Sequence, residues 1–176
     1  MQTMFISRAL LAKACILGLL VGWVTELPKN YFNSRQAKIQ NLLSQTDSKH
    51  QASPAVRASA EIDLLRLADI SSNNEAISIY QQILKVNPNS AKAHFLLAKL
   101  QLFGWYYQAR NQPVGTTLKQ NGLKHLKTAT YLYQKRGDTV AAAKLEKVYS
   151  QAQKETNPVN WVFPEWRYVD VKLSTQ

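Results

Sequence analysis

Apolar positions in the middle of the chain recur at intervals of three and four residues, which is the period of one face of an α-helix. The clearest run consists of Ala76, Ile79, Tyr80, Ile83 and Leu84. Asn87-Pro88-Asn89 ends this run, because proline disfavours helical backbone in the residue before it. The apolar period resumes beyond the turn at Ala93, Leu96, Leu97 and Leu100. Residues 75–100 are therefore predicted to form two helices joined by a tight turn.

The same period predicts further helices on both sides of this pair. Ser53-Pro54 is typical of a helix start, with serine as the N-cap and proline in the first turn. Gly137-Asp138 is typical of a helix stop followed by the cap of a new helix. The pattern predicts an all-α domain over residues 54–155, with helices at about 54–70, 75–86, 90–109, from 116 or 117 to the Gly137 stop, and from there to 154.

The N-terminal residues 1–25 have a different pattern. They hold no acidic residue, and Ala14–Val24 is an unbroken apolar run preceded by Arg8 and Lys13. A membrane span needs about 20 residues, which the segment reaches when it is counted back to Met4. No small-residue cleavage site follows the run, which favours an uncleaved transmembrane signal anchor over a cleaved signal peptide or a mitochondrial presequence. Basic residues flank both ends, so the positive-inside rule gives a near tie between the two orientations. A short N-terminal tail without acidic residues commonly stays inside, which favours a domain outside the cytoplasm.

Two segments flank the helical domain. Residues 26–53 are interpreted as a neck followed by a polar linker over 44–53. The neck is expected to contain a short helix whose one side is lined by Phe32, Ile39, Leu42 and Leu43. Residues 156–176 form an aromatic tail whose alternating pattern predicts an extended strand. So many large aromatic side chains after the last helix predict a docking tail for another subunit, formed by Trp161, Phe163, Trp166 and Tyr168.

The predicted hairpin resembles a tetratricopeptide repeat (TPR), an antiparallel helix pair of about 34 residues. Ala76 is followed four residues later by Tyr80 and twelve residues later by Pro88, as in that family. His94, Leu97 and Ala98 stand at the W-x2-L-G places of the next repeat, and an insertion of about a dozen residues separates them from its second helix. That helix restores the small-large-small spacing with Gly122, Leu126 and Ala129. Asp63 departs from the pattern, because the family has a buried leucine there.

The resemblance implies a peptide-binding groove, because the first helix of each TPR lines the concave face of the array. On the third helix this partner-binding groove would be formed by Lys92, Phe95, Lys99, Leu102 and Phe103. Two lysines around an aromatic residue suit an acidic or C-terminal peptide. The alternative is that these side chains pack against the chain's own insertion or tail.

Charge is the strongest signal that the helical pattern does not explain. The chain has 22 lysine and arginine residues against 11 acidic residues, a net charge of +11. Many of the cations fall on one face of each of the last two helices, a basic face formed by Lys124, Lys127, Tyr131, Lys135, Lys144 and Lys147. This face is either a solvated surface or a binding site for anionic lipid headgroups or an acidic partner, and nucleic acid is the less favoured ligand.

No catalytic motif is present. The three histidines, His50, His94 and His125, are separated in sequence and match no zinc or hydrolase signature. The single cysteine, Cys15, allows neither an internal disulfide nor a multi-cysteine metal site. We therefore expect a protein without enzymatic activity, metal or cofactor.

Together these features predict a TPR-like adaptor or accessory subunit that binds a membrane protein complex. Small membrane-anchored TPR proteins of bacterial envelopes are similar in layout, which implies a single-pass inner-membrane protein with the domain facing the periplasm. The alternative is a basic module that binds membrane surfaces or nucleic acid.

Overall fold

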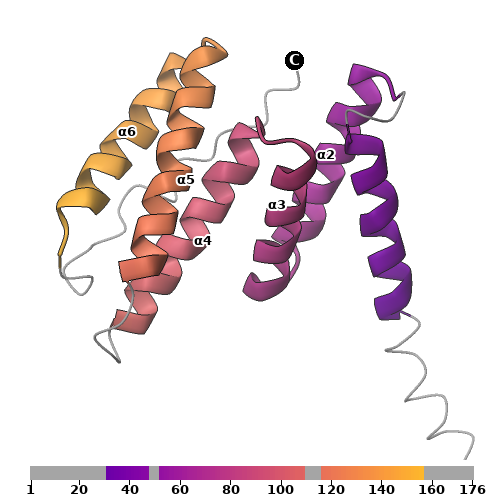
Figure 1. The fold of residues 1–176 in the computed structure, drawn as a ribbon, viewed down its shortest axis with the longest axis horizontal. Helices are drawn as coiled ribbons and strands as arrows, with labels where there is room; N and C mark the ends of the chain where they lie inside the picture. Colours follow the sequence, from indigo (N-terminus) through magenta and orange to yellow (C-terminus); the bar gives the residue numbers. More distant parts are fainter. Residues whose placement is uncertain (1–30, 48–51, 110–115, 157–176) are drawn as a thin grey trace, which may run out of the picture. The chain divides into compact units, whose positions relative to one another are not determined.

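The computed structural model describes residues 31–47, 52–109 and 116–156, and these residues are helices and short turns without strands (Figure 1). The chain divides into two compact units, residues 1–41 and 42–176. The first unit includes most of a helix that covers residues 31–46. In the second unit, the described residues form α2 (Pro54–Asp69), α3 (Asn73–Val86), α4 (Ala91–Ala109), α5 (Thr116–Lys135) and α6 (Thr139–Lys154). The all-α prediction is thus confirmed for the part of the chain that the structure describes.

Helix starts follow the caps that the sequence provides. The Ser53 hydroxyl accepts a hydrogen bond from Val56 N at 3.3 Å, so α2 begins at the expected Ser-Pro pair. The Ser90 hydroxyl caps α4 in the same way by accepting from Ala93 N at 3.2 Å. At the end of α5, Gly137 has a φ of 81°, a conformation that glycine adopts without a steric penalty. Asp138 N donates to the Tyr133 carbonyl and Gly137 N to the Gln134 carbonyl, which is the Schellman pattern of a helix end.

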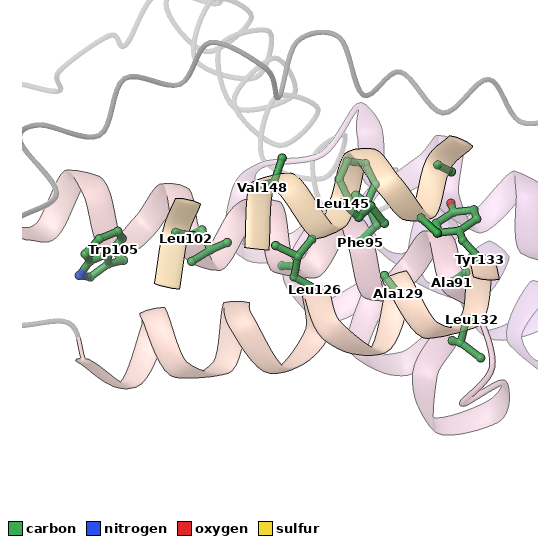
Figure 2. Close-up of a cluster of buried hydrophobic side chains, with 14 residues drawn as sticks. Ala91, Phe95, Leu102, Trp105, Leu126, Ala129, Leu132, Tyr133, Leu145 and Val148 are labelled. Carbon is green, nitrogen blue, oxygen red and sulfur yellow. The ribbon is translucent and has the colours of Figure 1, made fainter. Parts of the chain in front are cut away.

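Neighbouring helices in the second unit pack in chain order, α2 on α3, α3 on α4, α4 on α5 and α5 on α6. The largest part of the core lies among α4, α5 and α6, where Phe95, Leu126 and Leu145 meet (Figure 2). A Cβ atom at Gly122 would lie 2.6 Å from Leu102 Cγ, so the absence of a side chain at this position lets Leu102 pack directly against the α5 backbone. Gly122, the first small residue of the predicted small-large-small spacing, therefore has a direct packing role.

Two details of the sequence analysis need correction. Residues 44–46, assigned to the polar linker, are helical, and Thr46 is buried with its hydroxyl donating to the Leu42 carbonyl at 2.8 Å. Of the residues expected on the apolar side of the neck helix, Ile39, Leu42 and Leu43 are buried, whereas Phe32 is 59% exposed. No helix among the described residues is long and apolar enough to cross a membrane. The predicted anchor over residues 1–25 and most of the predicted tail lie outside the described residues.

Candidate functional site

The predicted basic face consists of exposed side chains. On α5, Lys124, Lys127 and Lys135 are exposed, and the Tyr131 ring that lies between them in sequence is 59% exposed. On α6, Lys144 and Lys147 are also exposed. Because all of these side chains reach solvent, the face is available to a ligand or partner.

The predicted groove on α4 is not a surface feature as a whole. Phe95 and Leu102 are 1% and 0% exposed and belong to the α4–α5–α6 core, so their side chains cannot line an open groove. They follow the helical period that packs against α5 and α6, which is why the sequence pattern alone did not distinguish them from groove residues. Lys92 and Lys99 are half-buried and Phe103 is 37% exposed, so these three retain surface area. The docking-tail residues Trp161, Phe163, Trp166 and Tyr168 lie outside the described residues.

The α3–α4 turn forms hydrogen bonds with α2 and with the residue that follows α5. Both oxygens of the Glu61 carboxylate accept hydrogen bonds, one from Asn87 Nδ2 and one from Ser90 Oγ, each at 2.6 Å. From the far end of α5, Arg136 Nη2 donates to the Asn89 carbonyl at 2.6 Å. These contacts hold the proline turn to α2 on one side and to α5 on the other, so the turn is a structural junction.

A histidine pair joins α4 to α5 near the same turn. The His94 and His125 Nδ1 atoms are 2.8 Å apart, and His94 Nε2 is 3.1 Å from the Pro88 carbonyl oxygen. Since a carbonyl can only accept, His94 carries its proton on Nε2, and in the neutral ring its Nδ1 is an acceptor. His125 must then donate from Nδ1, which fixes the tautomers of both rings.

The environment of this pair favours its neutral form. Burial lowers the pKa of His94, and its hydrogen bond to the Pro88 carbonyl acts in the opposite direction. Burial also lowers the pKa of His125 to about 4, with His94 and Lys124 adding to the effect. Among the described residues, no group of three or more histidine, cysteine or acidic side chains could hold a metal ion. The pair is thus a polar contact within the helix interface.

A lysine clamp connects the beginning of α5 to the end of α6. Lys119 Nζ donates to the carbonyls of Gln153 at 3.3 Å and Glu155 at 2.5 Å, and it lies 5.0 Å from the centre of the buried Trp105 ring. Burial lowers the pKa of the Lys119 ammonium, and the Glu155 carboxylate opposes that shift. A cation at a helix C-terminus balances the helix dipole and its unpaired carbonyls. This clamp fixes the point at which the chain leaves the last helix.

Neither contact could be predicted from the sequence. His94 and His125 are 31 residues apart and belong to no common motif. The predicted insertion separates Lys119 from Trp105, so no local pattern relates them.

Comparisons with known proteins leave the fold and site geometry as the basis for any assignment: no protein-family model matches the chain, and neither a curated protein nor a solved structure matches it.

Proposed function

We propose that this protein is a TPR-like, non-enzymatic adaptor, anchored in a membrane by its N-terminal segment, that binds a membrane protein complex. The observation that carries the proposal is the recurrence of one packing pattern in two consecutive hairpins. Ala76, Tyr80 and Ile83 are buried on α3, and Gly122, Leu126 and Ala129 are buried at the same spacing on α5. Such repetition of small and large positions is typical of helical repeat proteins, which act by presenting surfaces to partners.

The last helix supports the same interpretation. The apolar face of α6 packs on α5 through Ala141, Leu145 and Val148, while Ala143, Glu146 and Lys147 on its other face are exposed. A polar outer face on the terminal helix is what a short repeat array needs to remain soluble at its end. The aromatic residues that follow are then the strongest candidates for the partner contact, because tryptophan and tyrosine are enriched among residues that dominate binding energy.

The proposal is tested by deleting residues 158–176 from the full chain and isolating the complex from detergent-solubilised native membranes after cross-linking. We expect the truncated protein to keep its melting temperature within about 2 °C, a shift that corresponds to a small change in stability, and to lose its cross-linked partner. A matched control carries the tail with Trp161, Trp166 and Tyr168 replaced by serine, and it should also lose the partner. A truncated protein that melts much earlier would show that the tail belongs to the domain core, which contradicts its role in docking.

A further inference from the structure

The exposed side of α5 carries a regular line of cations. Lys124, Lys127, Tyr131 and Lys135, here called the α5 lysine stripe, are spaced by three, four and four residues and are all exposed. At 3.6 residues per turn these positions fall within about 80° of one another on the helix surface, over a length of about 16 Å. They lie on the side opposite the buried residues Gly122, Leu126 and Ala129. The stripe therefore projects away from the core along the C-terminal half of α5, from Lys124 to Lys135.

This charge has little compensation among the residues that the structure describes. Residues 76–137 contain nine lysine and arginine residues and no aspartate or glutamate. Lys124, Lys127 and Lys135 form no ion pair with the residues that the structure describes. On the adjoining α6, the Asp138 carboxylate is engaged in capping the helix, where it accepts from Ala141 N at 2.9 Å. An uncompensated row of positive charges attracts an anionic ligand from outside the chain.

We propose that the α5 lysine stripe binds the anionic phospholipid headgroups of the bilayer in which the N-terminal segment is anchored. The proposal rests on the membrane anchor of the proposed function. Tethering makes a weak surface contact effective, because an intramolecular encounter occurs at a high local concentration. Lipid binding by the stripe would also follow a common arrangement of membrane-attached proteins, in which one apolar anchor and one basic patch act together.

The shape and composition of the stripe favour a lipid surface over a peptide or a nucleic acid. The hollow of about 350 Å³ lies between α5 and α6 and is lined by Thr130 and Gln134 of α5, whereas those of about 420 and 460 Å³ border α2 with the α3–α4 turn and α6, respectively; no stripe residue lines any of the three. A line of exposed charges that lies outside these hollows suits a broad charged surface better than a single extended chain. Its cations are lysines, which act as point charges, whereas specific recognition of carboxylates or phosphates commonly uses the two-pronged arginine. An exposed tyrosine beside them is a typical residue of the membrane interface.

The experiment uses the full chain with Cys15→Ser and Gln120→Cys, labelled at the new cysteine with an environment-sensitive fluorophore. Gln120 is exposed and lies one turn before Lys124 on nearly the same side of α5. The protein is reconstituted into nanodiscs of phosphatidylcholine alone or with 30% phosphatidylglycerol. We expect a blue-shifted, quench-protected signal only in the anionic discs, and we expect 0.5 M NaCl to remove it.

Two matched triple variants test the assignment to the stripe. Lys124→Glu, Lys127→Glu and Lys135→Glu together should abolish the signal. Arg66→Glu, Lys85→Glu and Lys154→Glu make the same change in net charge at exposed cations of α2, α3 and α6 outside the basic face, and they should leave most of the signal. Equal loss in both variants, or an equal signal in both disc types, would overturn the proposal. Stripe-dependent binding of polyglutamate or a single-stranded oligonucleotide without any effect of phosphatidylglycerol would also overturn it and would identify the other class of ligand.

Failure of the anchor can be separated from failure of the stripe. A chain that does not enter neutral nanodiscs contradicts the anchor, and the stripe is then tested by flotation with vesicles containing 30% phosphatidylglycerol. Each lysine close to an anionic surface raises partitioning about five-fold, so reversal of the three stripe lysines should reduce flotation by at least ~100-fold. A reduction below about five-fold, or one equal to that of the control triple, would reject lipid binding by the stripe.

Discussion

The hairpins α2–α3 and α4–α5 bury the same pattern of small and large residues, but their connections differ in length. Ile70–Ser72 separate α2 from α3, whereas residues 110–115 separate α4 from the beginning of α5. In both hairpins the second helix buries a small residue and then a large one four positions later, Ala76 and Tyr80 in α3 and Gly122 and Leu126 in α5. The spacing on the second helix therefore defines the hairpin, and the connection can differ in length without altering this spacing.

The second hairpin differs in how its helices approach each other. Gly122 has no Cβ and therefore admits Leu102 directly against the backbone of α5, while Ala76 fills the corresponding place in α3 with a methyl group. The second hairpin also contains a polar contact, the His94–His125 pair, between its helices. The first hairpin is instead tied at its far end, where Glu61 of α2 accepts from Asn87 and Ser90 of the turn.

The largest expected loss of stability comes from removing the large buried residue of each hairpin, Tyr80 in α3 or Leu126 in α5. Tyr80 is 3% exposed, which confirms its predicted burial, and burial also raises the pKa of its hydroxyl to about 12, with Asp69 adding to the shift. Tyr80→Ala should lower the free energy of unfolding by about 3–5 kcal/mol, as expected for removal of a large aromatic side chain from a core. Leu126→Ala should cost about 2–5 kcal/mol for the same reason. Both are measured by urea denaturation.

Tyr131→Ala is the matched control for this experiment, because Tyr131 is 59% exposed. Its effect should stay within about 0.5 kcal/mol, the usual range for a surface substitution. A cost below about 1 kcal/mol for Tyr80→Ala alone would mean that the first hairpin is held by other contacts and that the two hairpins are not equivalent.

The helices could be predicted closely because their signals are local. The expected boundaries at residues 86, 109 and 154 coincide with the observed ends of α3, α4 and α6. Caps and turn residues determine these ends within a few positions of the chain, and apolar period determines the buried face. The exposure of Lys124 and Lys127 was predictable for the same reason, since charged residues on the side opposite the apolar face remain in water.

The contacts between elements could be predicted much less well. The periodicity of α4 could not show whether Phe95 lines an open groove or lies in the core, because both require an apolar side chain at this position. The packing of α5 and α6 against α4 places Phe95 in the core. The Lys119 clamp joins side chains and carbonyls that are 34 and 36 residues apart, and such a contact depends on how α5 and α6 are placed together. Pairing across helices requires knowledge of register, which no single helix contains.

A smaller loss of stability is expected when Gly122, which lets α4 and α5 approach closely, gains a side chain. Gly122→Ala places a methyl group 2.6 Å from Leu102 Cγ and 3.3 Å from Leu102 N, so the helices must shift. Overpacking of this kind costs about 1–3 kcal/mol, and the better helix propensity of alanine returns about 1 kcal/mol, so we expect net destabilisation in urea denaturation. Gly104→Ala is the control, because its Cβ would meet Leu118 Cδ1 at an ordinary 3.6 Å. Gly104→Ala should be neutral or stabilising, and the opposite order of the two variants would contradict the special role of Gly122.

The last prediction separates the hairpins by the pH dependence of their stability. Both histidines titrate near ~6.5 in the unfolded chain, whereas the pKa of His125 in the folded protein is lowered to about 4 by burial, His94 and Lys124. Between these pH values the unfolded chain binds more protons, so the free energy of unfolding should fall as the pH decreases from about 6.5 towards 4. The stabilising contribution is present above the unfolded pKa and is lost as the pH passes through the folded pKa. Melting temperatures measured from pH 7.5 to 4.5 should show this decrease in the native protein.

His125→Asn assigns the pH effect to the second hairpin. An asparagine amide can still donate to His94 Nδ1 but does not titrate, so the variant retains the contact and removes one proton-binding group. Its melting temperature should fall less than that of the native protein between pH 7 and pH 5. Carboxylates elsewhere in the chain titrate in both proteins, and the difference between the two curves removes their contribution. Parallel curves for the two proteins would mean that His125 accepts its proton in the folded state without strain on the α4–α5 interface, and the distinction between the hairpins would then rest on Gly122 alone.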